Sequence, residues 1–226
     1  MGTLSVVGTP IGNLGDITLR ALDTLKNADA IACEDTRVTA KLLARYDIQK
    51  PLLSYHAHSL ARATDRILAM LAEGKRVALV TDAGTPAISD PGTELVAAVR
   101  DRLGDGVVVE AIPGPAAVAA ALSIAGLPAA TFRFLGFIPH KKGRQTAFKE
   151  IAASEETIVF YESPHRILKA LESLAAGLPE GRRIAVCREL TKFHESVVRG
   201  TAAEVLAHFN DHPDQVRGEF AVVVAP

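Results

Sequence analysis

The 226-residue chain has few of the residues that mark specialised protein classes. It has no Trp and only two Cys, Cys33 and Cys187, which lie far apart without a CxxC pair. This pattern disfavours both a disulfide scaffold and a zinc site. Charge of either sign is not in excess, because 25 Lys and Arg stand against 26 Asp and Glu. A polyanionic partner would therefore have to bind a local basic patch.

Long hydrophobic runs are also missing. The longest apolar stretch, residues 116–130, contains Gly126 and Pro128 and is shorter than the ~20 residues of a membrane span. The first ten residues lack the basic and apolar segments of a secretory signal peptide. We therefore expect a cytoplasmic protein without a membrane partner. Its 48% hydrophobic and 23% charged residues are typical of a globular chain with a sizeable core.

Short β-branched runs alternate with helical stretches in the first half of the chain, which predicts an α/β fold with a mostly parallel sheet. The expected strands are residues 4–8, 28–33, 52–55, 76–81 and 107–112. The expected helices are residues 19–27, 36–46 and 59–73. The composition changes at residues 113–115 (PGP), so we expect two domains, residues 1–115 and 116–226.

The second half is expected to form a mixed sheet. After an Ala-rich helix, strands are expected at residues 132–137, 157–161, 183–188, 196–199 and 220–225. Ser163 followed by Pro164 predicts a helix start. Thr201 and Glu204 predict a capping box for a helix that reaches about Phe209.

Three loops that follow predicted strands are rich in Gly, Pro, Thr and Asp, namely residues 8–16, 82–92 and 113–117. Ligands of open α/β sheets bind beyond the carboxyl ends of the strands, although tight turns alone would have a similar composition. The loops lack the dinucleotide pattern GxGxxG, and GxxxxGK[ST] is absent from the chain. Backbone groups beside the carboxylate of Asp82 suit a ligand with polar edges and a positive centre. S-adenosylmethionine fits this description, but the spacing alone does not select it.

Charged residues follow other predicted strands, and each taken singly is more often structural than catalytic. Asp35 and Arg37, for example, could form a surface ion pair of little energetic value. The dense basic stretch at residues 140–144 supplies Lys141, Lys142 and Arg144 as expected RNA phosphate contacts, or else is a solvated loop between domains. No metal site is expected, since the pair His208 and His212 has no third ligand.

Seven motifs, in order and over essentially the whole chain, resemble the ribosomal-RNA branch of the tetrapyrrole methylase superfamily. They are TPIGNLGDITLRAL, EDTR, TDAGTPAISDPG, PGPAA, FLGFIP, YESPHR and RELTK followed by Glu195. The resemblance implies a two-domain α/β methylase with S-adenosylmethionine in the cleft between the domains, usually a homodimer. It also implies 2′-O-methylation of a cytidine in the decoding region of 16S ribosomal RNA, with the small ribosomal subunit as partner.

The resemblance also implies roles for individual residues. The expected cofactor contacts are Pro10, Asp82, Ala83, Gly84, Pro86, Ile88, Ser123, Ala125, Tyr161, Leu190 and Ala221. The expected RNA-facing residues are Glu34, Asp35, Arg37, His56, His165, Arg166, Lys192 and Glu195, and Arg188 is a further candidate for phosphate. The chain departs from the family pattern at Ser59, where relatives usually have Asn, and many relatives continue for several dozen residues beyond Pro226.

Methyl transfer to a ribose hydroxyl requires alignment of the reacting atoms and removal of the hydroxyl proton. We expect a carboxylate of Glu34, Asp35 or Glu162 to receive the proton, and Arg37 or Lys192 to stabilise the developing negative charge. The alternatives are a C-methyltransferase of a tetrapyrrole precursor and an RNA-binding module without catalysis. A nicotinamide dehydrogenase is disfavoured by the absent GxGxxG pattern.

Overall fold

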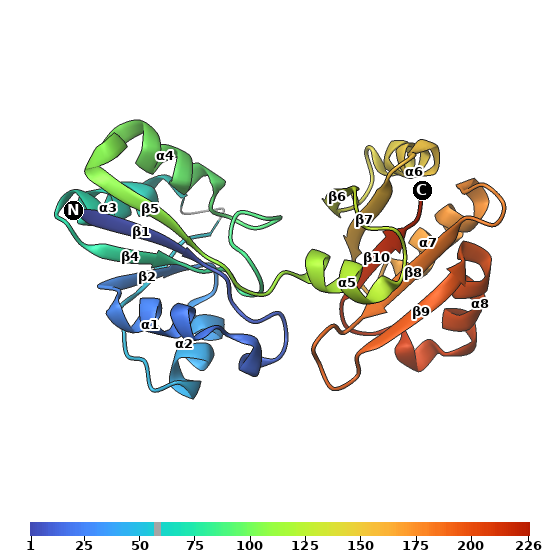
Figure 1. Ribbon diagram of the computed structural model, residues 1–226, viewed down its shortest axis with the longest axis horizontal. Helices are drawn as coiled ribbons and strands as arrows, with labels where there is room; N and C mark the ends of the chain where they lie inside the picture. The colour runs from blue at the N-terminus through green and yellow to red at the C-terminus, as the bar shows by residue number, and fades with distance from the viewer. Residues whose placement is uncertain (57–59) are drawn as a thin grey trace. The chain divides into compact units, whose positions relative to one another are not determined.

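The computed structural model describes residues 1–56 and 60–226, so Ser59 lies outside the described residues. The chain divides into two compact units, Met1–Ala116 (the first unit) and Ala117–Pro226 (the second unit). Each unit has one five-stranded sheet covered by helices (Figure 1). Within the described ranges, no helix has the length and apolar character that crossing a membrane requires.

The first unit is built on a sheet in which every strand pairing is parallel. Its strands are β1 (Gly2–Val7), β2 (Ala30–Cys33), β3 (Leu52–Ser54), β4 (Arg76–Leu79) and β5 (Val107–Ile112), in the order β3-β2-β4-β1-β5. The strands are short and apolar, as expected for a sheet that is buried on both faces. The α/β fold with a parallel first sheet is therefore confirmed.

Two pairs of helices cover the two faces of this sheet. They are α1 (Leu19–Asn27), α2 (Thr36–Arg45), α3 (Leu60–Ala72) and α4 (Thr93–Leu103), with single 3₁₀ turns at Leu14–Asp16 and Gly104–Gly106. Leu25 of α1 and Leu42 of α2 share one core cluster with Ala78, whereas Leu71 of α3 and Leu95 of α4 share another with Val77. Because Val77 and Ala78 are consecutive on β4, the two clusters lie on opposite faces. Helix α4 was not among the expected helices.

This arrangement creates a topological switch point in the first sheet. β1 and β4 are neighbours, but the chain leaves β1 for α1 on one face and leaves β4 for α4 on the other. The connections therefore diverge at the carboxyl ends of these two strands. Such points are where open α/β sheets bind ligands.

The second unit contains a mixed sheet, as expected. Its strands are β6 (Phe132–Phe137), β7 (Thr157–Glu162), β8 (Arg183–Arg188), β9 (Ser196–Thr201) and β10 (Phe220–Val224), in the order β6-β7-β10-β8-β9. β6 and β7 are parallel, and the other three pairings are antiparallel.

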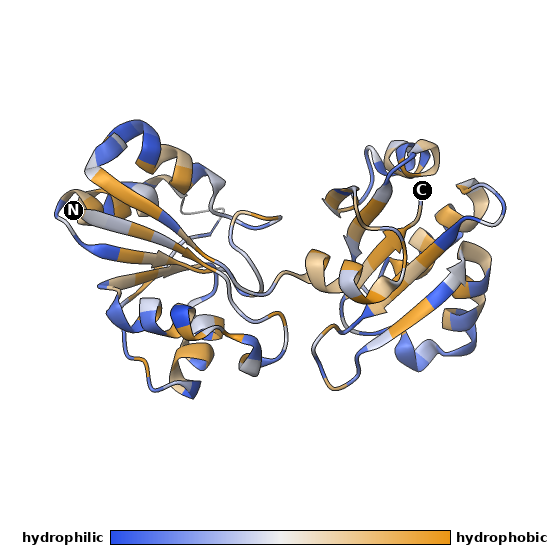
Figure 2. Ribbon diagram, in the orientation of Figure 1, coloured by the Kyte–Doolittle hydropathy of each residue, from blue (hydrophilic) through white to orange (hydrophobic). Residues whose placement is uncertain are grey.

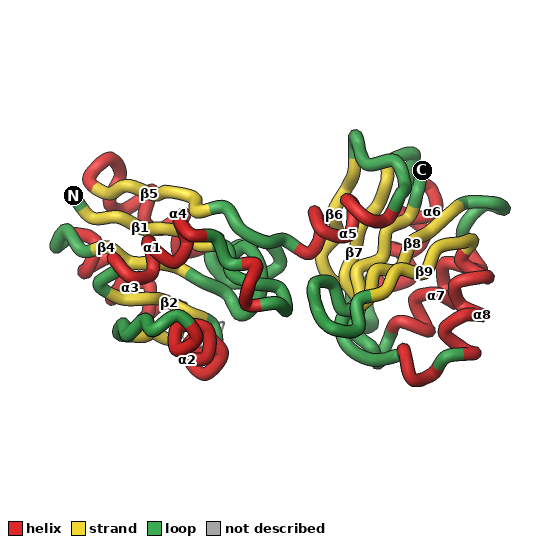
Figure 3. Tube along the Cα trace, turned by 60° about the horizontal axis from the view of Figure 1, so that its bottom comes forward, coloured by secondary structure: helices red, strands yellow, loops and turns green. Residues whose placement is uncertain are grey.

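Helices cover the second sheet unequally. They are α5 (Ala117–Ala125), α6 (Arg144–Ala153), α7 (Ile167–Gly177) and α8 (Ala202–Asp211), with a 3₁₀ turn at Pro213–Gln215. Phe148, Leu171 and Phe209 of α6, α7 and α8 form one core with Phe160 of β7. Ala121 of α5 packs on the other face, where its carbonyl lies 3.8 Å from the Cys187 Sγ. Figure 2 shows the apolar strands that lie between these layers, and Figure 3 shows the same layers along the Cα trace.

The predicted helix start at Ser163 is wrong, and the predicted capping box is confirmed. α7 begins at Ile167, because Ser163 forms a turn in which its carbonyl accepts from the N–H groups of Arg166 and Ile167. The Ser163 hydroxyl accepts from the Arg166 Nε instead of a backbone N–H. Thr201 and Glu204 cap α8 reciprocally.

The basic stretch at residues 140–144 does not form a loop between domains. It connects β6 to α6 inside the second unit, and Arg144 is the first residue of α6. The alternative interpretation as a loop between domains is therefore wrong, although residues 140–143 are exposed.

Candidate functional site

Hydrogen bonds join the three loops singled out from the sequence at the switch point of the first unit. The N–H of Thr9 donates to the Gly84 carbonyl at 2.8 Å, and the N–H of Gly84 donates to the Thr9 carbonyl at 3.1 Å. The Thr85 hydroxyl donates to the carbonyl of Pro115 at 3.3 Å. The loops that follow β1, β4 and β5 therefore form one connected structure at a single edge of the sheet.

Close backbone packing in this structure requires glycine. A Cβ on Gly8 would lie 2.8 Å from the Cα of Gly114, which leaves no room for a side chain. Gly84 has a φ of +91°, a conformation that other residues rarely adopt. Two non-glycine residues, Ala87 (φ 69°) and Ser89 (φ 64°), also have a left-handed backbone in the loop after β4. Residues held in such conformations cluster at functional sites.

The expected cofactor residues of the first unit fall into two groups. Asp82, Ala83 and Ile88 are exposed, with Ile88 48% exposed. Pro10, Gly84 and Pro86 are buried. The exposed group leaves polar and apolar atoms accessible at the surface of the loops, whereas the buried group packs within them.

Four carboxylates, which we call the acidic edge, lie at this end of the sheet: Glu34, Asp35, Asp82 and Asp90. The Asp35 N–H donates to the Asp82 Oδ1 at 3.0 Å, and the Thr81 hydroxyl donates to the Glu34 Oε2 at 3.3 Å. Burial raises the pKa of Asp90 to about 6; a hydrogen bond with Thr81 opposes this rise, and the charges of Glu34 and Asp82 add to it. The carboxylates therefore interact with one another.

The side chain of Asp35 is bound by groups of its own helix. Its side chain caps α2 by accepting from the Arg37 N–H at 2.8 Å and pairs with the Arg37 guanidinium at 2.6 Å. The hydrogen bond from the Arg37 side chain, with that from its backbone, lowers the pKa of Asp35 to about 2. A carboxyl with such a low pKa is a weak base at neutral pH. The guanidinium of Arg37 itself is 86% exposed.

The residues at this edge fit S-adenosylmethionine, the donor expected from the sequence. This molecule carries a positive sulfonium centre and a positive amino group, which suit the exposed Asp82 beside other carboxylates. The positive φ of Gly84 turns the backbone of this loop directly after Asp82 and Ala83, both of which are exposed. Among the described residues, no group of three or more His, Cys, Asp and Glu could hold a metal ion.

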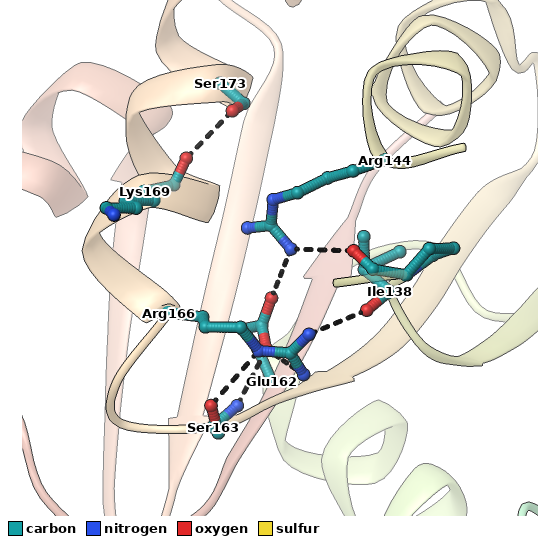
Figure 4. A network of polar contacts seen from close by, with 8 residues as sticks. Ile138, Arg144, Glu162, Ser163, Arg166, Lys169 and Ser173 are labelled. Carbon is teal, nitrogen blue, oxygen red and sulfur yellow. Dashed lines mark hydrogen bonds and ion pairs between the residues drawn. The ribbon is translucent and has the colours of Figure 1, made fainter. Parts of the chain in front are cut away.

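A buried ion-pair network lies at the carboxyl ends of β6 and β7 in the second unit (Figure 4). The Glu162 side chain has no exposed surface and pairs with Arg144 at 2.9 Å and with Arg166 at 2.7 Å. The Ser163 N–H also donates to the Glu162 Oε1 at 2.9 Å. Both carboxylate oxygens are thus occupied by donors, an arrangement that does not suit proton removal from a substrate.

A second charged group follows β8. Lys192 pairs with Glu189 at 2.8 Å and with Glu219 at 2.6 Å. Burial lowers the pKa of Lys192, but these hydrogen bonds and charges outweigh it, so the net change is upward and the ammonium stays charged. Glu189 and Thr191 have positive φ angles of 51° and 66°, so the loop has a specific, strained backbone.

Neighbouring residues stabilise the same loop. The carboxylate of Glu195 accepts from the Thr191 N–H at 2.5 Å. Arg188, predicted to contact phosphate, is 8% exposed and donates to the carbonyls of Arg217 and His194 at 2.9 and 3.0 Å. Arg188 therefore supports the loop from within.

The remaining predicted residues differ in accessibility. Tyr161 is half-buried, and its ring lies edge-on to Phe134 at 4.9 Å and to Phe137 at 5.5 Å. Ala125, Leu190 and Ala221 are buried, so a ligand would meet their backbone more readily than their side chains. Of the other residues, Ser123, Lys141, Lys142 and His165 are exposed and His56 is half-buried.

Sequence reasoning missed Asp90, Thr81 and the pairing of Glu162 with two arginines. Asp90 belongs to the TDAGTPAISDPG motif, which follows a predicted strand. Its place in this loop could have indicated that it lies near Asp82. The partners of Glu162 come from α6 and from the turn before α7, and no sequence spacing indicates that Arg144 reaches it.

The family described as Tetrapyrrole (Corrin/Porphyrin) Methylases matches residues 3–206 of the chain. The chain is 47% identical over 226 residues to "Ribosomal RNA small subunit methyltransferase I" of Synechocystis sp., covering 100% of this chain and 79% of that protein. It is 47% identical to the protein of that name in Bacillus subtilis (99% and 75% covered). The protein of that name in Thermotoga maritima is 43% identical (100% and 99% covered).

Solved structures of other methyltransferases have a similar fold. The methyltransferase CobJ matches with a TM-score of 0.72 at 20% identity, over 100% of this chain and 94% of that chain. Cobalt precorrin-4 methyltransferase CbiF matches with a TM-score of 0.72 at 22% identity, over 99% and 94%. At these identities the likeness shows the fold alone.

S-adenosylmethionine is the methyl donor of this family. The motifs, the two sheets and the match over nine-tenths of the chain agree with one another. The chain therefore belongs to the tetrapyrrole methylase family and, within it, to the group of the ribosomal RNA small subunit methyltransferases I.

Proposed function

We propose that the protein transfers the methyl group of S-adenosylmethionine to the ribose 2′-hydroxyl of a cytidine in the decoding region of small-subunit ribosomal RNA. Relatives at 43–47% identity that carry the ribosomal RNA name support the choice of RNA over a tetrapyrrole. The two solved methyltransferase structures support only the fold, since their identities are 20% and 22%.

The observation that carries the chemistry is the acidic edge at the switch point of the first unit. Bound S-adenosylmethionine supplies an electrophilic methyl group on a positively charged sulfur. In this proposal the Asp82 carboxylate, which is exposed and accepts a hydrogen bond from the Asp35 N–H, stabilises that positive charge. The three connected loops shape the binding surface around it.

Glu34 is the proton acceptor in this proposal. Asp35 is bound to Arg37 and has a pKa of about 2, and Glu162 is buried between two arginines. Glu34 is half-buried at the carboxyl end of β2 and accepts a 3.3 Å hydrogen bond from the Thr81 hydroxyl. It therefore remains, of the three expected bases, the carboxylate without an arginine partner among the described residues.

Arg37 is the group that stabilises negative charge on the attacking oxygen. Its guanidinium is 86% exposed and is oriented by the adjacent Asp35. Lys192, the other expected candidate, is bound by two carboxylates and is 28% exposed. A fixed cation at the oxygen would favour the developing alkoxide.

The proposal includes the setting of the reaction. The substrate is RNA within the small ribosomal subunit, the cytidine is presented from a single-stranded or melted region, and the protein acts in the cytoplasm as a homodimer. The resemblance to the ribosomal-RNA branch supports these points. Light scattering of the purified protein measures the number of chains per particle.

The test is methyl transfer from labelled S-adenosylmethionine to small subunits that lack the modification, followed by mapping of the methylated nucleotide. We expect one labelled cytidine ribose. A parallel reaction with a uroporphyrinogen-type tetrapyrrole should remain unlabelled. Label in the tetrapyrrole and none in the RNA would overturn the proposal in favour of C-methylation, and failure to bind S-adenosylmethionine would leave only an RNA-binding module.

A further inference from the structure

We propose that the buried carboxylate of Glu162 is a positioning residue that fixes a phosphate-binding surface for RNA, formed by the exposed Lys141 and Lys142. This inference rests on the proposed function, since RNA is the ligand. It assigns Glu162 a role other than proton removal, and it assigns Arg144 and Arg166 a role other than direct contact with RNA.

Both arginines connect Glu162 to the segment that follows β6. Arg166 donates to the Ile138 carbonyl at 3.0 Å, and Arg144 lies 3.4 Å from the carbonyl of Pro139 (Figure 4). The Arg144 guanidinium also lies over the Phe148 ring, 5.0 Å from its centroid. The start of the segment and its end at Arg144 are therefore held by a single carboxylate.

The side chains between these two anchors are not held in this way. Lys141 and Lys142 are exposed, and no ion pair is found for either within the described part of the chain. By contrast, the side chains of Arg144 and Arg166 are only 16% and 14% exposed. The two lysines are thus presented to solvent on a backbone whose ends are fixed.

The local charge indicates the partner. Residues 132–149 contain five Lys and Arg and no Asp or Glu, although the whole chain has a net charge of −1. A polyanion with regularly spaced phosphates, such as RNA, complements this surface.

The first experiment measures the affinity of the protein for a small-subunit ribosomal RNA fragment between 50 and 200 mM salt. The double variant Lys141→Gln/Lys142→Gln should bind about tenfold more weakly at low salt. Its slope of log K against log salt should be smaller by about 1.4–1.8, the value for two lost phosphate contacts. The matched control Lys26→Gln/Lys75→Gln removes two exposed charges elsewhere and should bind like the wild type. In methyl transfer, the effect should fall on KM rather than on kcat.

The second experiment tests positioning by a double-mutant cycle. Arg144→Gln should weaken RNA binding in the wild-type background and have no further effect in the Lys141→Gln/Lys142→Gln background, because it acts through the lysines. Affinity for S-adenosylmethionine, measured by calorimetry, should remain that of the wild type in every variant.

Two outcomes overturn the inference while leaving the proposed function intact. In the first outcome, the wild-type protein methylates RNA and the double lysine variant binds RNA with the affinity and salt slope of the wild type. This outcome can be observed even if the Arg144 variant does not fold. The other is full additivity of Arg144→Gln with the lysine substitutions. A wild-type protein that does not methylate RNA contradicts the proposed function instead.

Discussion

The acidic edge of the first unit and the basic surface of the second unit carry opposite charges on two five-stranded sheets, one all parallel and the other mixed. The acidic edge gathers Glu34, Asp35, Asp82 and Asp90 at the end of a parallel sheet. The basic surface consists of the exposed Lys141 and Lys142, in a segment whose two ends are held through Arg166 and Arg144. The chain as a whole is almost neutral. A nearly neutral chain can therefore contain two regions of opposite local charge. The charge of the acidic edge suits a cationic methyl donor, and that of the basic surface suits a polyanion.

The largest expected effect is on catalysis at the acidic edge. Glu34→Gln keeps the shape of the side chain and removes the proton acceptor, so single-turnover methyl transfer should fall about 10²–10⁴-fold. Affinity for S-adenosylmethionine, measured by calorimetry, should be little changed. A rate near that of the wild type would exclude Glu34 as the base.

Loss of the buried Glu162 carboxylate should lower the free energy of unfolding. Glu162→Gln leaves two guanidinium groups in a buried site without their counter-charge, which should cost about 3–5 kcal/mol in the free energy of unfolding. Glu219→Gln is the matched control, because its side chain is 74% exposed and pairs with Lys192; it should cost less than about 1 kcal/mol. Urea unfolding compares the two, and equal small losses would contradict the description of Glu162 as a buried anchor.

Asp82→Asn tests whether the acidic edge recognises positive charge. The variant should bind S-adenosylmethionine about tenfold more weakly, as expected for the loss of one ionic contact in a partly exposed site. Binding of S-adenosylhomocysteine, which lacks the sulfonium charge, should fall less. Equal losses for both compounds would show that Asp82 does not act through charge.

Asp90 gives a smaller, pH-dependent effect. The pKa of Asp90 is raised from 3.8 to about 6, so folding disfavours the ionised form of this carboxyl. The free energy of unfolding therefore decreases as pH rises from 4 to 6. Asp90→Asn should therefore stabilise the protein at pH 7, on the order of 1 kcal/mol after allowance for solvent screening. Thermal unfolding at pH 4 should show little difference between variant and wild type; a gain that is the same at both pH values would point to another cause.

Much of the fold was predictable from local patterns. The strands of the parallel sheet are short runs rich in apolar residues, and the capping box of Thr201 and Glu204 is a local motif. Helix α4 was missed, and its apolar positions Leu95 and Val99 are four residues apart directly after a loop rich in Gly and Pro. The start of α7 was misplaced, because the Ser163 side chain bonds to an arginine rather than to the backbone.

The candidate site was predictable only in part. The position of the three loops at one edge follows from the rule for parallel sheets, and the structure joins them by hydrogen bonds. The roles of the carboxylates depend on partners that are distant in sequence, such as Thr81 for Glu34 and Arg144 for Glu162. No spacing rule indicates such pairs. Burial and pairing, which distinguish Glu34 from Glu162, emerge only in the folded chain.

The most direct test of the whole account is a crossed titration of two ligands against two variants. Calorimetry with S-adenosylmethionine and fluorescence titration with ribosomal RNA would be applied to Asp82→Asn and to Lys141→Gln/Lys142→Gln. The account predicts that the first variant loses affinity for the methyl donor alone and the second for RNA alone. Loss of both affinities in both variants, or the reverse assignment, would contradict the division between the acidic edge and the basic surface.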